Sequence, residues 1–231
     1  MQMFTAQFLF QSLFSDKYGK VISRRPSMVG DEEESDRAKL HEMTTQCHRQ
    51  QAFYALAAIV PAARRVVLEH RIELQTLREL VQASPFVPFD REDAFARGLL
   101  AGLRGDMATA IHLLVLQLEN AFRTYFEQQG FPTSRVDKHG IQEDFDLNEL
   151  LRSPVFPKLF GEDMTFNLRV MLVEKAGLNL RNNLAHGLMS DREMSSSTWN
   201  FLWWLVLRLC LEPFVQRNEA NGPADAAEET Q

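Results

Sequence analysis

Apolar side chains recur with a helical period along most of the chain. Between residues 38 and 81 this period predicts two helices. The first is marked by apolar residues at i, i+3, i+4 and i+7: Phe53, Leu56, Ala57 and Val60. Pro61 follows this stripe and predicts a break or a kink, because proline lacks the N–H that a helix interior uses.

The second helix of the pair continues the pattern through Val67, Leu74, Leu77 and Val81. His70 lies three residues after Val67 on the same stripe, which favours a hydrogen-bonded core histidine over a catalytic one. Residues 84–89 contain prolines within an apolar run, and they predict an ordered apolar connector.

Aspartates mark the starts of the next two helices. Asp90 is the predicted N-cap of the first, with Asp93 in its first turn. Its apolar face consists of Phe95, Leu99 and Leu103. After a break at Gly105, Asp106 is predicted to cap the central helix, which runs to about residue 129.

The period is lost after the central helix. Residues 131–148 mix a proline, a glycine and several charges, and we expect a loop there that can overhang a functional site. Residues 147–152 predict one helical turn, and residues 153–161 a proline-containing connector. Asp163 or Thr165 is expected to begin the following helix, and Gly177 to end it.

The last helix is apolar on nearly every side. It is expected to run from Thr198 to about Glu212, as a core element that also contributes to dimerisation. It is too short for a bilayer and contains Arg208, so we do not expect a membrane span. The segment after Pro213 lacks apolar residues and is predicted to be disordered.

These elements predict an all-α fold. The predicted architecture is a helical bundle with an irregular loop region between the central helix and the helix of residues 178–188. An N-terminal extension and linker covers residues 1–37 and includes the acidic run at 31–34. The helical domain covers residues 38–214, and a disordered acidic tail covers residues 215–231.

Composition narrows the function classes. The net charge of −6 over 231 residues argues against indiscriminate nucleic-acid binding, although it leaves room for a local basic pocket. With only Cys47 and Cys210, neither a disulfide framework nor a cysteine metal site is expected, and a reducing cytoplasmic setting is predicted. Residues 1–14 lack a signal-peptide pattern, and they fit a partner-bound segment or the truncated start of a longer protein.

The candidate chemistry lies in residues 178–188. Arg181 and His186 are five positions apart, with Asn182 and Asn183 directly after the arginine. A guanidinium pairs well with a phosphate, and an imidazole exchanges a proton near neutral pH. We expect both side chains to address one phosphate across the start of this helix. The spacing alone is weak, since Arg65 and His70 share it.

The run Arg-Asn-Asn-Leu-Ala-His-Gly resembles the R-x4-6-H motif of the HEPN superfamily, whose members are all-helical and include metal-independent endoribonucleases of toxin and antiviral systems. The whole chain up to about Phe214 is similar to an uncharacterised bacterial family with a C-terminal HEPN-like domain. This closer resemblance rests on residues 84–88, 102–123 and 177–188 and on the helix containing Trp203 and Trp204.

The resemblance implies a role for the central helix. HEPN domains often carry an acidic or polar residue on an earlier helix beside the motif, which favours Glu119 as the group that holds Arg181 or orients His186. His112 and Arg123 share the stripe of Glu119, at seven and four residues from it, and are candidate substrate-binding residues. The alternative is a Glu119–Arg123 surface pair with a half-buried His112.

Two functions therefore stay open. The first is a metal-independent endoribonuclease that acts on RNA without a cofactor. It would work as a homodimer through the motif helix. An antitoxin, a regulatory partner or an N-terminal region that this sequence lacks would restrain its activity. Arg181, His186, Asn182 and Glu119 would form its catalytic centre, and Asn183 would bind the phosphate. The second is a non-catalytic module that binds nucleotide, RNA or protein, or only dimerises.

Overall fold

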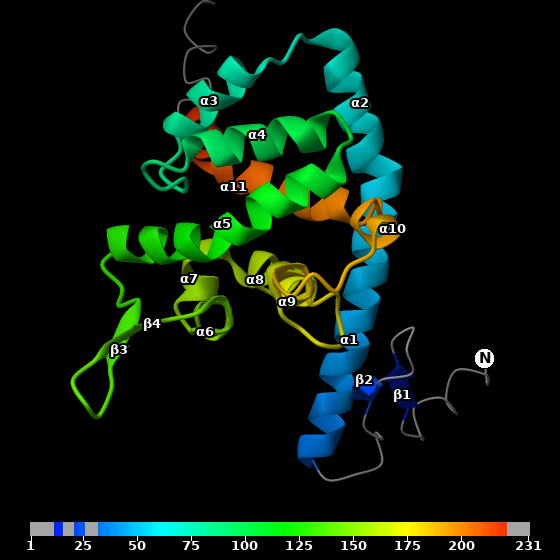
Figure 1. The fold of residues 1–231 in the computed structure, drawn as a ribbon, viewed down its shortest axis with the longest axis vertical. Helices are drawn as coiled ribbons and strands as arrows, with labels where there is room; N and C mark the ends of the chain where they lie inside the picture. Colours follow the sequence, from blue (N-terminus) through cyan, green and yellow to red (C-terminus); the bar gives the residue numbers. More distant parts are fainter. Residues whose placement is uncertain (1–11, 16–20, 26–31, 221–231) are drawn as a thin grey trace, which may run out of the picture. The chain divides into compact units, whose positions relative to one another are not determined.

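The computed structural model describes residues 12–15, 21–25 and 32–220, and the side chains of residues 32–212. The chain divides into two compact units. The first consists of Met1–Tyr54 and Leu147–Met189, and the second of Ala55–Asp146 and Ser190–Gln231. Helices dominate both units, so the prediction of an all-α helical bundle is confirmed (Figure 1).

The first unit is organised around α8. Its helices are α1 (Glu32–Tyr54), α6 (Leu147–Arg152), α7 (Phe156–Phe160), α8 (Glu162–Leu172) and α9 (Leu180–Ala185). Helix α8 contacts α1, α6, α7 and α9, and it buries Leu168, Met171 and Leu172. Strands β1 (Ser12–Ser15) and β2 (Val21–Arg25) pair antiparallel, and β2 contacts α1.

The second unit contains the π-helix η2 (Ala55–Ile59), α2 (Val60–Glu69), α3 (Leu74–Gln82), α4 (Glu92–Leu103), α5 (Met107–Gln128), α10 (Asp191–Met194) and α11 (Trp199–Ala220). Helices α4 and α5 pack along each other, and α11 contacts both (Figure 1). A two-stranded antiparallel ribbon, β3 (Ser134–Val136) with β4 (Gln142–Asp144), lies inside the region predicted as an irregular loop.

Aromatic side chains fill the core of the second unit. The Phe86 ring lies 6.3 Å from that of Phe95 and 5.2 Å from that of Phe122, so the predicted apolar connector between α3 and α4 packs into the core through Phe86, whereas Phe89 is exposed. Trp203 lies against Gly102, where an added Cβ atom would come within 2.1 Å of the indole ring. The indole N–H of Trp203 donates a hydrogen bond to the Leu99 carbonyl. Aromatic burial on this scale supplies much of the stabilisation of a small domain.

Several boundaries differ from those predicted. The acidic run is not a linker: Glu32, Glu33 and Glu34 form the first turn of α1, where carboxylates interact favourably with the helix dipole. Pro61 does not end the helix, because it lies at the start of α2 directly after the π-helix, where its missing N–H leaves no bond unmade. Helix α11 continues past Pro213 to Ala220, so residues 215–220 are helical rather than disordered.

Two smaller expectations also fail. Asp90 is not an N-cap: it has a positive φ of 62°, and Arg91 occupies the cap position of α4. His70 is exposed at the C-cap of α2 rather than buried in the core, and Val67 beside it is exposed as well. By contrast, Asp106 caps α5 as predicted and accepts a hydrogen bond from the Thr109 amide.

One helical stretch among the described residues, Glu32–Glu69, is long and apolar enough to cross a bilayer by length and composition. Only 17% of the qualifying window is buried. Core helices of water-soluble proteins and signal sequences pass the same test, so a single stretch is weak evidence for a membrane span.

Polar residues line the inner side of α1. His41, Thr44 and Gln51 are buried there, and the Gln51 amide donates to the Asn167 side chain on α8 at 2.9 Å. The neighbouring His48 is partly buried, and its Nδ1 atom has no hydrogen-bond partner. Burial lowers the pKa of His48 from its ordinary value of 6.5, because desolvation penalises the charged imidazolium.

This lowered pKa predicts acid sensitivity. The folded chain binds fewer protons at His48 than the unfolded chain does, so this stability is present above pH 6.5 and is lost as pH falls through the folded-state pKa. Urea unfolding followed by far-UV circular dichroism from pH 7.5 to pH 5 should show a decline that His48→Gln reduces. The exposed His139 provides the control. An unchanged slope in His48→Gln, or an equal reduction in His139→Gln, would contradict the assignment.

Candidate functional site

A tight turn sets the position of the motif helix α9. Helix α8 ends at Leu172, and the Leu178 amide then bonds back to the Val170 carbonyl at 3.1 Å. Gly177 lies so close to this carbonyl that a Cβ atom would come within 2.1 Å of the oxygen. Gly177 was predicted to end α8, but that helix already ends at Leu172 with Val173 as its cap, and the glycine instead permits the close approach of the two backbone segments.

Asn179 completes the turn in a left-handed conformation, with φ 46° and ψ 38°. Asparagine tolerates this region better than most residues, because its short polar side chain bonds to nearby groups. Its Oδ1 accepts a hydrogen bond from the Asn182 amide at 2.7 Å. This role of Asn179 was not predicted from the sequence, although an asparagine after Gly-Leu at a helix start was an available signal.

Helix α9 presents the motif on one short segment. Leu180 and Leu184, one turn apart, are buried and hold the helix in the unit. Arg181, directly after Leu180, is half-buried, whereas His186 is exposed. The motif residues are therefore accessible to solvent and are not sealed in a core.

The two asparagines of the motif hold its backbone and its arginine. Arg181 Nη1 donates to Asn182 Oδ1 at 3.1 Å, so Asn182 connects Arg181 to Asn179. The Asn183 amide donates to the Leu178 carbonyl at 3.0 Å. These contacts position the turn and the guanidinium. A direct contact of Asn182 or Asn183 with a phosphate stays a prediction.

The expectation that one phosphate binds across the start of the motif helix requires a longer helix than α9. It begins at Leu180 and ends at Ala185, so His186 occupies the C-cap and lies past the helix end. The five-residue separation corresponds to a rise of roughly 7.5 Å and an offset of about 140°. At this offset the two residues do not lie on one face of α9, so a ligand that reaches both has to be met by a bent Arg181 side chain or by a second copy of the helix.

The candidates on α5 belong to the other unit. Arg123 Nη2 donates to Glu119 Oε1 at 3.1 Å and to the Phe145 carbonyl at 2.8 Å, which ties the segment after β4 to α5. His112 is exposed, and its Nδ1 lies 2.7 Å from the Ala108 carbonyl. The predicted Glu119–Arg123 pair is present, but His112 is not half-buried. A contact of Glu119 with Arg181 or His186 stays a prediction.

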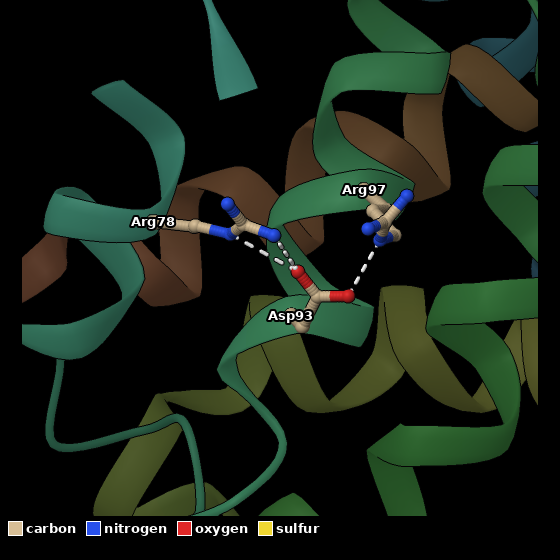
Figure 2. Close-up of polar contacts among 3 residues, drawn as sticks. All are labelled: Arg78, Asp93 and Arg97. Atoms are coloured by element: carbon tan, nitrogen blue, oxygen red, sulfur yellow. Dashed lines mark hydrogen bonds and ion pairs between the residues drawn. The ribbon is translucent and has the colours of Figure 1, made fainter. Parts of the chain in front are cut away.

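Figure 2 shows a second polar cluster that the sequence analysis missed. Asp93 of α4 accepts hydrogen bonds from Arg78 of α3 at 3.0 and 2.5 Å, and from Arg97 of α4 at 2.5 Å. The bonds from Arg78, and then those from Arg97, lower the pKa of Asp93. Asp93 and Arg97 are exposed and Arg78 is partly exposed, so the cluster joins the helix surfaces without forming an enclosed site.

Within the described part of the chain, no three histidine, cysteine or acidic residues gather as a metal site would require. Cys47 and Cys210 are free thiols, and burial raises the pKa of Cys210 to about 12. No protein-family model matches the chain, and no curated protein or solved structure is significantly similar to it. The chemistry of the motif must therefore be argued from its own residues.

Replacement of Gly177 tests the turn before α9. Gly177→Ala would force a methyl group against the Val170 carbonyl, and overpacking of this kind costs about 1–3 kcal/mol. Lys175→Ala, in the same turn but with an exposed side chain, is the matched control. Urea unfolding followed by circular dichroism should separate the two variants, and equal midpoints would contradict the close approach.

Replacement of Arg123 tests the tie between α5 and the segment after β4. Arg123→Ala removes the hydrogen bond to Phe145 and the ion pair with Glu119, a loss of about 1–3 kcal/mol. Arg97→Ala breaks only an exposed pair and should destabilise the fold less. Tryptophan fluorescence reports this unit alone, because Trp199, Trp203 and Trp204 all belong to it. The opposite ranking would show that Arg123 contributes little.

Proposed function

We propose that this chain is a HEPN-like, metal-independent endoribonuclease whose catalytic pair is Arg181 and His186. The observation that supports it most is the accessibility of a tethered guanidinium on α9 and of an imidazole at the C-cap of the same helix. Arg181 is held by Asn182, which reduces the entropy lost when it binds a phosphate.

The proposed reaction needs only these side chains and the RNA. His186 removes the proton from a 2′-hydroxyl, and the 2′-oxygen attacks the adjacent phosphorus. Arg181 stabilises the negative charge that grows on the equatorial phosphate oxygens, typically the largest single contribution in such reactions. The P–O5′ bond breaks, and the 5′-oxygen takes up a proton from the imidazolium or from water. The products carry a 2′,3′-cyclic phosphate and a 5′-hydroxyl.

The acidic net charge bears on how RNA would be bound. A chain of charge −6 lacks a general attraction for the phosphate backbone, so binding has to depend on local contacts. This requirement fits an enzyme with a restricted set of RNA targets, in a toxin or antiviral setting, better than a general RNA-degrading enzyme. A homodimer through the motif helix, with the exposed Leu188 beside His186, belongs to the same proposal.

A second candidate function has its own supporting observation. The contacts among Arg181, Asn182 and Asn179 are internal to the turn, and they would hold α9 in place even without any chemistry. A non-catalytic module that binds RNA, nucleotide or protein would use the same network to keep its surface rigid. The two functions differ in whether the RNA is cleaved or only bound.

The deciding experiment incubates the purified chain with total RNA and with tRNA, followed by end-group analysis. Arg181→Ala and His186→Ala should each reduce cleavage by at least 100-fold, on the order expected for loss of a general base or a charge-stabilising group. Arg65→Ala and His70→Ala are the matched controls, because this exposed pair has the same spacing elsewhere. EDTA should leave the rate unchanged.

The outcomes separate the two functions. Absence of cleavage in the native chain, combined with binding of a 2′-O-methyl oligonucleotide, would support the non-catalytic module. Equal loss of cleavage in the Arg65 and His70 variants, or strict dependence on a divalent metal, would contradict the proposed mechanism. Circular dichroism of each variant excludes loss of the fold as the cause.

A further inference from the structure

A carboxylate shared by two arginines lies in the turn that leads to α9. Glu174 follows the end of α8, and only 14% of its side chain is exposed. Its Oε1 atom accepts hydrogen bonds from Arg169 Nε at 3.2 Å and from Arg169 Nη2 at 2.8 Å. Arg152, the last residue of α6, places its Nη2 atom 3.5 Å from the same oxygen. The cluster therefore carries two positive charges and one negative charge.

The two arginines hold Glu174 unequally. The Arg169 side chain is 26% exposed, and it makes two charge-assisted hydrogen bonds to the mostly buried carboxylate. The Arg152 side chain is 54% exposed, and no other hydrogen bond or ion pair holds it among the residues that the structure describes. Because Arg169 already neutralises the carboxylate, the charge of Arg152 is in excess.

The cluster and the motif meet at the same end of α8, which contacts both α6 and α9. The Val170 carbonyl, next to Arg169 in the sequence, accepts a hydrogen bond from the Leu178 amide. Arg181 follows Leu178 by three residues. Even a fully extended chain from Glu174 to Arg181 would span at most about 25 Å, and the turn between them makes the separation shorter.

The charge at this end of α8 is positive. Residues 169–189 contain three basic side chains, Arg169, Lys175 and Arg181, and a single carboxylate, Glu174. Lys175 is exposed. The two carboxylates of α8 itself lie in its first turn, roughly 15 Å away along the helix.

Helix α6 leaves this balance unchanged, because it adds one carboxylate, Glu149, and one cation, Arg152. The whole chain has a net charge of −6, so this end of α8 is a local exception. A local positive field is what an acidic chain needs in order to bind a polyanion at one place.

We propose that Arg152 binds a second phosphate of the RNA strand whose scissile phosphate is bound by Arg181. The strand then runs from α9 toward the end of α6. This inference rests on the proposed function, because it takes the ligand to be RNA. The remaining N–H groups of the Arg152 guanidinium match a phosphate, and Glu174 does not repel the strand, since Arg169 neutralises it.

Arg152 also has a structural explanation. It belongs to the last turn of α6, where a positive charge interacts favourably with the helix dipole. A purely structural Arg152 would affect stability and leave RNA binding unchanged. A phosphate-binding Arg152 would affect RNA binding and leave stability nearly unchanged, because Arg169 keeps Glu174 paired without it.

The salt dependence of binding measures the phosphate contact directly. Fluorescence anisotropy of a labelled 2′-O-methyl oligoribonucleotide gives Kd at several NaCl concentrations. Each phosphate contact on a single strand contributes about 0.7 to the slope of log Kd against log salt. Arg152→Gln should lower the slope by about this amount and weaken binding at low salt by at least about threefold. Arg152→Lys, which keeps the charge, should retain most of the slope.

Arg97 provides the matched control (Figure 2). It shares the carboxylate of Asp93 with another arginine, Arg78, and its side chain is 55% exposed, nearly the same as that of Arg152. It belongs to α4, in the other unit. Arg97→Gln should leave the slope unchanged, and its urea midpoint should agree with that of Arg152→Gln.

The cleavage reaction gives an independent readout. A phosphate remote from the reacting atoms is bound equally in the ground state and in the transition state. Arg152→Gln should therefore raise KM for RNA by more than it lowers kcat, whereas Arg181→Ala should lower kcat.

Three results would overturn the inference. They are a native slope in Arg152→Gln, an equal reduction of the slope in Arg97→Gln, and displacement of the oligonucleotide by poly-glutamate as efficiently as by unlabelled oligonucleotide. The last result would identify the surface as a site for an acidic protein.

The two proposals fail in different ways. Cleavage by the native chain with an unchanged slope in Arg152→Gln removes the second phosphate site and leaves the nuclease. Binding without cleavage, with a reduced slope in Arg152→Gln, removes the nuclease and leaves the phosphate site. A native chain that does not bind the oligonucleotide overturns both.

Discussion

The candidate site depends on the close approach of two backbone segments at Gly177. Because no Cβ atom fits beside the Val170 carbonyl, this position has to be glycine, and the chain can turn sharply out of α8. Asn179 then adopts a positive φ, and its side chain holds Asn182, which in turn holds Arg181. The direction of the guanidinium is thus determined by backbone geometry two to four residues earlier in the sequence.

The sequence predicted this region well where the signal was local. The capping aspartate at α5 and the single helical turn of α6 each depend on neighbouring residues, and both are present. Gly177 was expected to end α8, but that helix ends at Leu172. The left-handed Asn179 and the short length of α9 were not predicted, because both depend on how α8 packs against the turn. The Arg78–Asp93 hydrogen bonds join two different helices, so no pattern of neighbouring residues in the sequence predicts them.

Tertiary context explains the larger errors. Pro61 was predicted to break or kink the helix, but the helical stretch continues across it, from the π-helix η2 directly into α2. His70 was placed in the core from its spacing, yet the chain leaves the helix at that residue. Phe53 and Leu56 belong to the apolar stripe that the sequence shows, but both side chains are exposed. Helical periodicity identifies the apolar face of a helix. It does not show whether that face packs against another part of the same chain.

The proposed mechanism requires that Arg181 and His186 act on one phosphate. The most direct measurement is the NMR signal of the His186 imidazole during titration with a 2′-O-methyl oligoribonucleotide, which binds but cannot be cleaved. The account predicts a saturable shift of this signal in the native chain and a strongly weakened response in Arg181→Ala, with the His70 signal unchanged. Shifts at His186 and His70 that are equal, or that persist without Arg181, would contradict it.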